Sequence, residues 1–409
     1  MRLRVIALLC AAVVSACSST TTTSSSSTSS SGQTIKIGVD LPVSGADASI
    51  GIPTQNGAVM AIDEANKNGF GGGKFTLAAS LLDDAVQGKH DPAAGAQNVK
   101  TFISDNSVLG MIGPFNSNVA VAEIPLTNDA GLVQISPSNT NDGLTIGAAA
   151  KTLRSSKPDQ NAYFRVCTRD SSQGLALAQF TKKLGPTSAF IIDDNETYGK
   201  GLADSYEAAY TKLGGKVLGH EHITANQQDF KALLTKIKSF SPGIVFFGGN
   251  TSTGGGLLRR QMGDVGMSAV PFIGGDGISD PEFETTAGPM ANGTYFSVAA
   301  PDATRLGSAK TFVADYKERF KSDVGGYSAN AYAATKIIIA AIQKAIDEDG
   351  GKMPTREQVL KNVAGTKNFA TPIGEITFDA NGDTTSPVLT LQKVSGGKVI
   401  TVDVITVKN

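Results

Sequence analysis

The fold of this 409-residue chain is most clearly indicated by the stretch VLGMIGPFNSN, residues 108–118. Its first part, Val108–Ile112, is a mostly apolar run of strand length, and the loop Gly113–Asn118 then opens a segment with helical spacing. A continuous apolar run is typical of a strand that is buried on both faces of a parallel sheet. The stretch therefore predicts a strand, a loop at its carboxyl end, and a helix.

Similar units recur on both sides of this stretch. Short runs rich in β-branched residues alternate with longer segments whose apolar residues recur every three or four positions, as in Val59–Ala65 and Val99–Ile103. Alternation of this kind implies βαβ units and a mostly parallel sheet. The candidate strands are Ile35–Leu41, Phe75–Leu82, Val108–Gly113, Leu132–Ile135, Ser188–Asp193, Lys216–His222, Gly243–Phe247 and Val270–Ile273.

The pattern restarts near Tyr163, where the strand Tyr163–Val166 leads into a helix at Ser172–Leu184. The sequence therefore predicts an α/β protein of two doubly wound lobes, with binding sites at the carboxyl ends of the strands. The C-terminal third departs from this rhythm, because three helices precede three strands linked by turns at Asn381–Asp383 and Ser395–Gly397. These elements are expected at Gly307–Phe320, Ala329–Asp347 and Thr355–Val363, then at Gly374–Phe378, Val388–Val394 and Val399–Val407.

The N-terminal residues indicate where the protein works. Arg2 and Arg4 precede the apolar run Val5–Val14, which has the layout of a secretory signal and is too short to cross a bilayer. The motif VSAC, residues 14–17, resembles the lipobox of bacterial lipoproteins, in which the leader is cut before a cysteine that becomes lipidated. We therefore expect a signal peptide at residues 1–16, then a lipidated Cys17 and a flexible Ser/Thr-rich tether at residues 17–33. The alternative is an ordinary secretion signal without an anchor.

Composition and missing motifs exclude several classes of function. Cys10 lies in the leader, so Cys167 alone is left for the folded part and no disulfide is expected there. A net charge of −1 argues against nucleic acid or an anionic membrane surface as partners. No Gly-Lys pair is followed by Ser or Thr, and no Gly-x-Ser-x-Gly elbow occurs, so these phosphate-binding and hydrolase motifs are excluded. We expect neither enzyme activity nor a cofactor.

The chain contains three histidines, His90, His220 and His222. His220 and His222 alternate on one predicted strand and can share a face, but no third ligand has the spacing of a zinc site, so no metal is expected. The nearby acidic run Asp193–Glu196 lacks the glycine and the terminal glutamate of a calcium loop. It is predicted as a strand-to-helix turn whose acids favour the helix N-terminus.

Three loops carry groups suited to a small polar ligand. Gly113–Asn118 offers backbone N–H groups and the Ser117 hydroxyl to an anion, although Ser117 taken alone is better interpreted as a helix cap. Ile135–Thr140 leaves the next strand at the same end of the sheet and adds further hydroxyls. Gly274–Gly277 places Asp276 after an apolar strand, where an isolated aspartate is better interpreted as a turn residue.

In their order along the chain, these loops and other motifs resemble the substrate-binding proteins of ABC importers for branched-chain and related amino acids. The motifs are Ile35–Val39 with Ser44–Gly45, Ala61–Asn66, Asp83–Asp84, Ile112–Pro114, Ser136–Pro137, Tyr198–Gly201, Asp229–Phe230 and Leu257–Gln261. The resemblance implies a type I periplasmic binding protein, whose two lobes are joined by three crossover strands and close over one ligand. The lobes would comprise residues 34–162 with 301–380, and residues 163–300 with 381–409. The partners would be an ABC permease and its ATPase, and the protein itself would lie outside the cytoplasm, anchored to the cell membrane.

The resemblance also implies a ligand site. An acidic residue, Asp276, would meet the α-ammonium of an amino acid, and Tyr198 would cover the ligand backbone. A zwitterion taken out of water needs both a donor cluster and a carboxylate, which agrees with these residue types. The α-carboxylate would be held by Ser117, Ser138 and Thr140. The remaining ligand-binding positions would be Ile50, Phe115, Asn116, Asn250 and Tyr327.

Some positions depart from the family pattern. Ile50 and Asn250 stand where branched-chain binders tend to carry tyrosine, and a polar Asn250 argues against a purely aliphatic ligand. The cysteine bridge of the family is absent, since Val86 and Asn116 occupy the comparable positions. A short amide, a urea-like compound or an aromatic acid is therefore the alternative ligand, and ligand sensing is the alternative to transport.

Overall fold

The computed structural model describes residues 32–224 and 227–406, so the expected leader, Cys17 and most of the tether lie outside the described residues. Val407, the last residue of the predicted terminal strand, also lies outside them. The larger strands are β1 (Gln33–Leu41), β2 (Phe75–Asp83), β5 (Val108–Ile112), β6 (Val133–Ser136), β7 (Tyr163–Arg165), β8 (Ser188–Asp193), β9 (Lys216–His222), β10 (Ile244–Gly248), β11 (Phe272–Gly274), β12 (Tyr295–Val298), β15 (Val388–Ser395) and β16 (Lys398–Thr406). Two short pairs are β3 (Ala85–Val86) with β4 (Lys89–His90) and β13 (Phe369–Thr371) with β14 (Gly374–Ile376).

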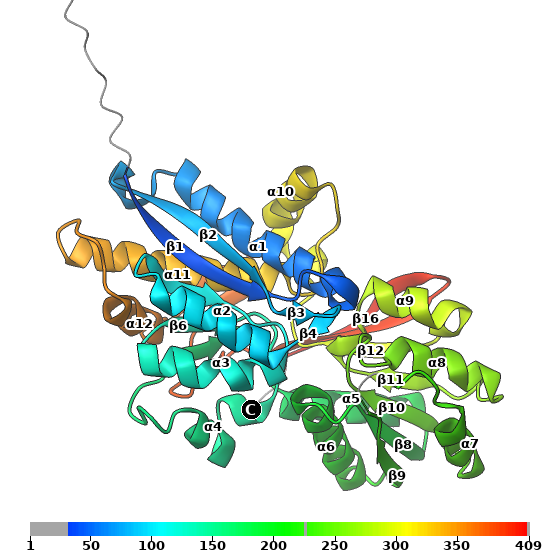
Figure 1. The fold of residues 1–409 in the computed structure, drawn as a ribbon. Helices are drawn as coiled ribbons and strands as arrows, with labels where there is room; N and C mark the ends of the chain where they lie inside the picture. The colour runs from blue at the N-terminus through cyan, green and yellow to red at the C-terminus, as the bar shows by residue number, and fades with distance from the viewer. Residues whose placement is uncertain (1–31, 225–226, 407–409) are drawn as a thin grey trace, which may run out of the picture. The chain divides into compact units, whose positions relative to one another are not determined.

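The twelve larger strands build two sheets, which Figure 1 shows side by side. One is five-stranded with the order β2-β1-β5-β6-β7, and the other is seven-stranded with the order β16-β15-β12-β11-β10-β8-β9. The helices are α1 (Ala48–Lys67), α2 (Pro92–Ser104), α3 (Ser117–Ala130), α4 (Gly147–Leu153), α5 (Asp170–Leu184), α6 (Thr197–Lys212), α7 (Lys231–Ser239), α8 (Gly255–Asp264), α9 (Pro281–Ala287), α10 (Lys310–Phe320), α11 (Ser328–Glu348) and α12 (Arg356–Ala364).

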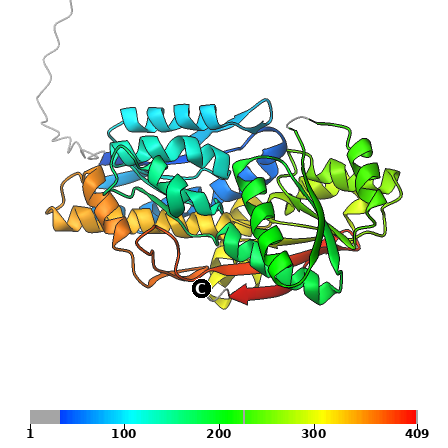
Figure 2. The ribbon, with the colours of Figure 1, turned by 90° about the horizontal axis from the view of Figure 1, so that it is seen from below.

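Helices cover both faces of the five-stranded sheet (Figures 1 and 2). Ile37 and Val39 of β1 pack into the core cluster that includes α1 and α11. Gly38 faces the other way, and a Cβ there would come within 2.9 Å of the Phe102 ring of α2. Successive residues of a strand point to opposite faces, so the apolar run of β1 serves two helical layers.

The seven-stranded sheet is covered in the same way. Phe190 and Ile192 of β8 belong to the cluster that holds α7, α8 and α9. Ala189 and Ile191 of the same strand belong to the cluster that holds α5 and α6. Each sheet is thus covered by helices on both faces, as the alternation of strands and helices in the sequence predicts.

The chain passes between the two sheets three times: from β7 to α5, from β12 towards α10, and from β14 to β15. The predicted fold class, two doubly wound α/β lobes joined by three crossovers, is therefore confirmed. The exact lobe boundaries stay a prediction. The strand β7 pairs in parallel with β6 and completes the five-stranded sheet, which thus extends past the predicted lobe end at residue 162 to Arg165.

The C-terminal strands differ in part from the expectation. The chain does reverse at the predicted turn, since Phe378 and Thr384 form an antiparallel bridge. However, β14 pairs with β13 in a separate small sheet. Only β15 and β16 form the expected hairpin, at the edge of the seven-stranded sheet. Over residues 32–224 and 227–406, no helix is long and apolar enough to cross a membrane.

Candidate functional site

The loop between β5 and α3 is held in one conformation by its surroundings. Gly113 has a φ of +116°, and a Cβ there would come within 2.1 Å of the Asp40 carbonyl oxygen, so glycine is required. The Phe115 carbonyl oxygen accepts hydrogen bonds from Ser138 Oγ at 2.9 Å and from Asn139 Nδ2 at 2.7 Å. The loop therefore places the Phe115 ring and the start of α3 at the carboxyl end of the five-stranded sheet.

The residues predicted to bind a carboxylate are buried near the start of α3. Ser117 is the first residue of α3, and its Oγ accepts a hydrogen bond from the Asn141 backbone N–H at 3.4 Å. Ser138 and Thr140 are buried in the next loop. Asn116 is also buried, and its Oδ1 has no hydrogen-bond partner among the residues described. The structure therefore gathers these four predicted residues at one end of the sheet.

Asp276 lies at the carboxyl end of β11, in the seven-stranded sheet. Its Oδ1 accepts hydrogen bonds from Gln173 Nε2 at 2.6 Å and from the Tyr198 hydroxyl at 3.1 Å. The Tyr198 hydroxyl in turn accepts a hydrogen bond from the Gly277 N–H at 3.1 Å. Tyr198 and Gln173 therefore orient the Asp276 carboxylate, from helices on the same side of the second lobe.

The Asp276 carboxylate is buried, with 6% of the residue exposed. Burial raises its pKa, and the hydrogen bond from Gln173 works against that rise. No lysine, arginine or histidine within the described part of the chain forms an ion pair with Asp276. Because a buried carboxylate without a cation is costly in free energy, this position is complementary to a small positively charged group.

A cavity between the two lobes lies against Asp276. The cavity itself measures about 50 Å³, and about 380 Å³ when the open space at its mouth is included. Four residues proposed from the sequence to bind the ligand line it: Ile50, Phe115, Asp276 and Tyr327. Tyr327 packs edge-on against Phe115 with ring centroids 5.5 Å apart. The other lining residues are Ser49, Thr54, Ser279, Pro281, Val298, Gly325 and Gly326.

Asn250 is not among the residues that line this cavity. Its backbone N–H donates to Asp194 Oδ2 at 3.2 Å, and its Nδ2 lies 3.5 Å from the same oxygen. Asn250 therefore secures its own loop, which differs from the predicted pocket position. The other predicted residues outside the lining are Asn116, Ser117, Ser138, Thr140 and Tyr198.

Three further residues belong to the site but were not predicted from the sequence: Ser49 and Ser279, which line the cavity, and Gln173, which contacts Asp276. Gln173 lies inside α5, where no loop motif marks it, and its Nε2 also donates to Ser297 Oγ of β12 at 2.9 Å. Its role follows from the packing of α5 on the sheet, which the sequence does not display. Ser279 lies two residues after the Gly274–Gly277 loop, and Ser49 lies in the first turn of α1. The one sequence signal for these two serines is that each lies close to a motif of the family.

Polar contacts join the two lobes beside the cavity. His90 of β4 has Nδ1 at 2.7 Å from Asp47 Oδ2 and Nε2 at 2.8 Å from Glu196 Oε2, which precedes α6 in the other lobe. Asn141 Nδ2 donates to the Thr197 carbonyl oxygen at 2.7 Å. The structure is thus closed over the cavity. Two doubly wound lobes that enclose a small cavity with one unpaired acid define a two-lobed solute-binding protein.

Comparison with known proteins agrees with this class. The chain matches the periplasmic binding protein family over residues 34–398. It is 33% identical over 368 residues to Leu/Ile/Val-binding protein homolog 3 of Brucella melitensis biotype 1, which covers 90% of this chain and 93% of the relative. The chain therefore belongs to the periplasmic binding protein family.

Two solved structures are similar to the whole folded part. The leucine-binding protein LivK of Thermotoga maritima has a TM-score of 0.79 at 27% identity, over 91% of this chain and 99% of that protein. LivJ of Streptococcus pneumoniae, a branched-chain amino acid transporter substrate-binding protein solved with isoleucine, has a TM-score of 0.78 at 27% identity, over 92% and 100%. Family and fold are those of solute-binding proteins and not of enzymes.

Proposed function

We propose that this protein captures an α-amino acid with a branched aliphatic side chain between its two lobes and delivers it to an ABC permease. The observation that carries the proposal is the Asp276 carboxylate, which is buried at the cavity, oriented by Gln173 and Tyr198, and without a cationic partner among the described residues. An α-ammonium group would supply the missing charge with strong, charge-assisted hydrogen bonds.

The α-carboxylate is assigned to the start of α3. The first N–H groups of a helix have no partners within the helix and favour an anion. Ser117 adds a hydroxyl there, and the adjacent Phe115 lines the cavity. Ser138 and Thr140 would support this end from the next loop, and Ser138 does so by holding the Phe115 carbonyl.

The side-chain end of the ligand is assigned to the apolar part of the cavity. The apolar side chains in its lining are Ile50, Phe115, Pro281, Val298 and Tyr327. Asn250, whose polarity argued against an aliphatic ligand, is bonded to Asp194 and does not line the cavity. Matching of apolar surfaces therefore supports leucine, isoleucine or valine over a polar ligand.

A thermal-shift screen tests this function. Leucine, isoleucine and valine are compared with short amides, urea and aromatic acids, each at a saturating concentration. A ligand at 100 times its dissociation constant adds about 2.7 kcal/mol to the stability of the folded state, which is readily measured. We expect the branched-chain amino acids to raise Tm. If only amides or aromatic acids do so, the proposed ligand class is wrong.

We also propose that Cys17 anchors the protein to the membrane. The support is the lipobox-like stretch at residues 14–17 and the Ser/Thr-rich segment that follows it. Cell fractionation of the wild type and of Cys17→Ala tests this. We expect the variant to leave the membrane fraction, whereas unchanged membrane association would exclude the anchor.

A further inference from the structure

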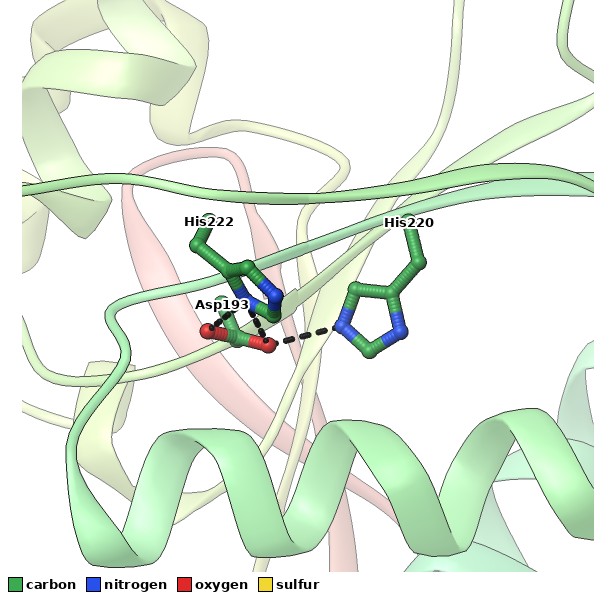
Figure 3. Close-up of side chains that lie close together, drawn as sticks. All are labelled: Asp193, His220 and His222. Carbon is green, nitrogen blue, oxygen red and sulfur yellow. Dashed lines mark hydrogen bonds and ion pairs between the residues drawn. The ribbon is translucent and has the colours of Figure 1, made fainter.

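A cluster of two histidines and one aspartate lies at the ends of β8 and β9, apart from the ligand cavity (Figure 3). His220 Nε2 lies 2.7 Å from Asp193 Oδ2, and His222 Nδ1 lies 2.8 Å from both oxygens of the same carboxylate. The three ligand atoms all lie within 4.8 Å of one another. Over residues 32–224 and 227–406, no other group of three such side chains brings its ligand atoms so close.

The sheet explains how these side chains meet. His220 and His222 are two residues apart on β9, so they project from one face of the strand. The neighbouring strand β8 runs parallel, and its last residue, Asp193, is the register partner of His222. The third metal-ligating side chain comes from the adjacent strand β8, so it does not appear in the sequence of β9 itself.

The surroundings resemble those of a metal site. Glu207 Oε2 of α6 lies 2.7 Å from His220 Nδ1, the ring nitrogen on the side away from Asp193. A histidine that binds a metal commonly donates its second N–H to a carboxylate, which fixes the ring and its tautomer. Asp193 is also oriented, since its Oδ1 accepts a hydrogen bond from the Asn195 N–H at 2.7 Å.

The cluster is reachable from outside. The Asp193 side chain is fully buried, that of His220 is 15% exposed, and that of His222 is 49% exposed. A buried carboxylate at the base with a half-exposed imidazole at the rim leaves one side open, where water can complete the coordination of an ion.

We propose that Asp193 Oδ2, His220 Nε2 and His222 Nδ1 bind one divalent transition-metal ion of the Zn²⁺ type, with Glu207 as the residue that orients His220. Two imidazole nitrogens and one carboxylate suit Zn²⁺ and its neighbours, whereas Ca²⁺ and Mg²⁺ prefer sites made of oxygen. The fourth ligand would be water.

The required movement is small. Ligand atoms of a tetrahedral zinc site lie about 3.3 Å apart, given bonds of about 2.0–2.1 Å. The nitrogens and oxygens of the cluster lie 2.7–2.8 Å apart, so a metal needs an opening of roughly half an ångström.

Calorimetry with ZnCl₂ tests the site. The protein is produced without a histidine tag, stripped with a chelator and titrated, and Co²⁺ serves as a spectroscopic probe of tetrahedral coordination. We expect one Zn²⁺ per chain. His222→Gln, at the exposed rim and thus safe for folding, should weaken binding more than about 100-fold, and Glu207→Gln, as an outer-shell change, about 10–100-fold.

Glu221→Gln is the matched control. Glu221 lies between the two histidines on β9, and its carboxylate pairs with Lys236 at 2.7 Å. The control should bind Zn²⁺ as the wild type does. Absence of stoichiometric Zn²⁺ binding to the wild type, or equal affinity of His222→Gln and Glu221→Gln, would overturn the proposal and leave the cluster as an ion-pair network.

Discussion

At the scale of single residues, Gly275 controls the position of Tyr198. Its φ of −97° and ψ of −162° are open to any residue, so backbone strain is not the constraint. The constraint is space, because a Cβ at Gly275 would lie 2.4 Å from both the Tyr198 hydroxyl and Leu202 Cδ2. We predict that Gly275→Ala displaces Tyr198 from Asp276 and weakens ligand binding about tenfold or more. This is the effect expected when one hydrogen bond to a charged group is lost.

Isothermal titration calorimetry measures this effect. Gly307→Ala is the control, since a Cβ at Gly307 meets no atom within 4 Å. Affinity should fall in Gly275→Ala and stay unchanged in Gly307→Ala. Equal affinity in both variants would show that Tyr198 does not position Asp276.

A second prediction at the level of residues concerns the stability contributed by the ion pair of Arg165 and Asp383, which lies at a crossover between the lobes. Arg165 is fully buried, and its Nε donates to Asp383 Oδ1 at 2.6 Å. Its other nitrogens donate to the carbonyl oxygens of Asn139 and Asn141 and to the Thr145 hydroxyl. Removing one partner of a buried ion pair leaves the other charge uncompensated, so Asp383→Ala should lower the free energy of unfolding by about 3–5 kcal/mol.

Urea denaturation checks this value against an exposed ion pair. Lys317 and Asp323 lie 2.6 Å apart, with side chains 67% and 83% exposed. Asp323→Ala should change the stability by less than about 1 kcal/mol. A similar small loss in Asp383→Ala would mean that Arg165 finds other partners and that the crossover does not depend on the pair.

Part of the candidate site could be predicted from loops that follow a strand. Asp276 and Phe115 each lie in a loop after an apolar run, and both line the cavity. Gln173 was not predictable, because it reaches the site from a helix interior. Asn250 also follows a strand, but whether such a residue faces the cavity or its own loop depends on local partners such as Asp194, which the sequence does not reveal.

At the scale of elements, most strands were predictable because each is a short apolar run that alternates with helical spacing. The prediction of β9 at Lys216–His222 agrees with the structure at both ends. The strand β12 was missed, since it has only four residues and carries the buried polar Ser297. The pairing of β14 with β13 also escaped prediction, because a strand of three residues has little pattern of its own.

The contact of β4 with the start of α6 predicts that the free energy of unfolding depends on pH. Burial lowers the pKa of His90, but the hydrogen bonds that its ring donates to the Asp47 and Glu196 carboxylates outweigh burial and raise the pKa from 6.5 to about 10. The other acid that acts on this group is Asp84, which lies nearby and is itself buried. A raised pKa means that His90 stabilises the folded state fully below pH 6.5 and loses this contribution as the pH rises through about 10.

His90→Gln removes the charge and tests whether the stabilisation by His90 is lost as the pH rises. Urea unfolding of the wild type and the variant is compared at several pH values. The wild type should be more stable by a few kcal/mol near pH 6, and the difference should shrink progressively towards pH 10. A difference that does not vary with pH would show that His90 acts as a neutral residue. Glu196→Gln, which removes only the negative charge from the contact between the lobes, should give a smaller effect of the same sign.

At the scale of the whole molecule, ligand binding requires the two lobes to move. The cavity is enclosed between the lobes, so a ligand must enter through an open form and be held by hinge closure. Small-angle X-ray scattering should show a smaller radius of gyration when leucine is added. The change should be larger in His90→Gln, which lacks a charged contact that favours closure. No change in either protein at saturation would contradict a closing cleft.

The proposed function depends on a zwitterion bridging the two lobes, with its ammonium group at Asp276. Calorimetry tests this with leucine and with 4-methylpentanoate, the same molecule without its amino group, in the wild type and in Asp276→Asn. Loss of one partner of a buried charge pair costs about 2–5 kcal/mol, so either change should weaken binding by some tens to thousands of times. If the wild type binds both compounds equally, or if Asp276→Asn binds leucine as tightly as the wild type, Asp276 does not recognise an α-ammonium group and the proposed ligand is wrong.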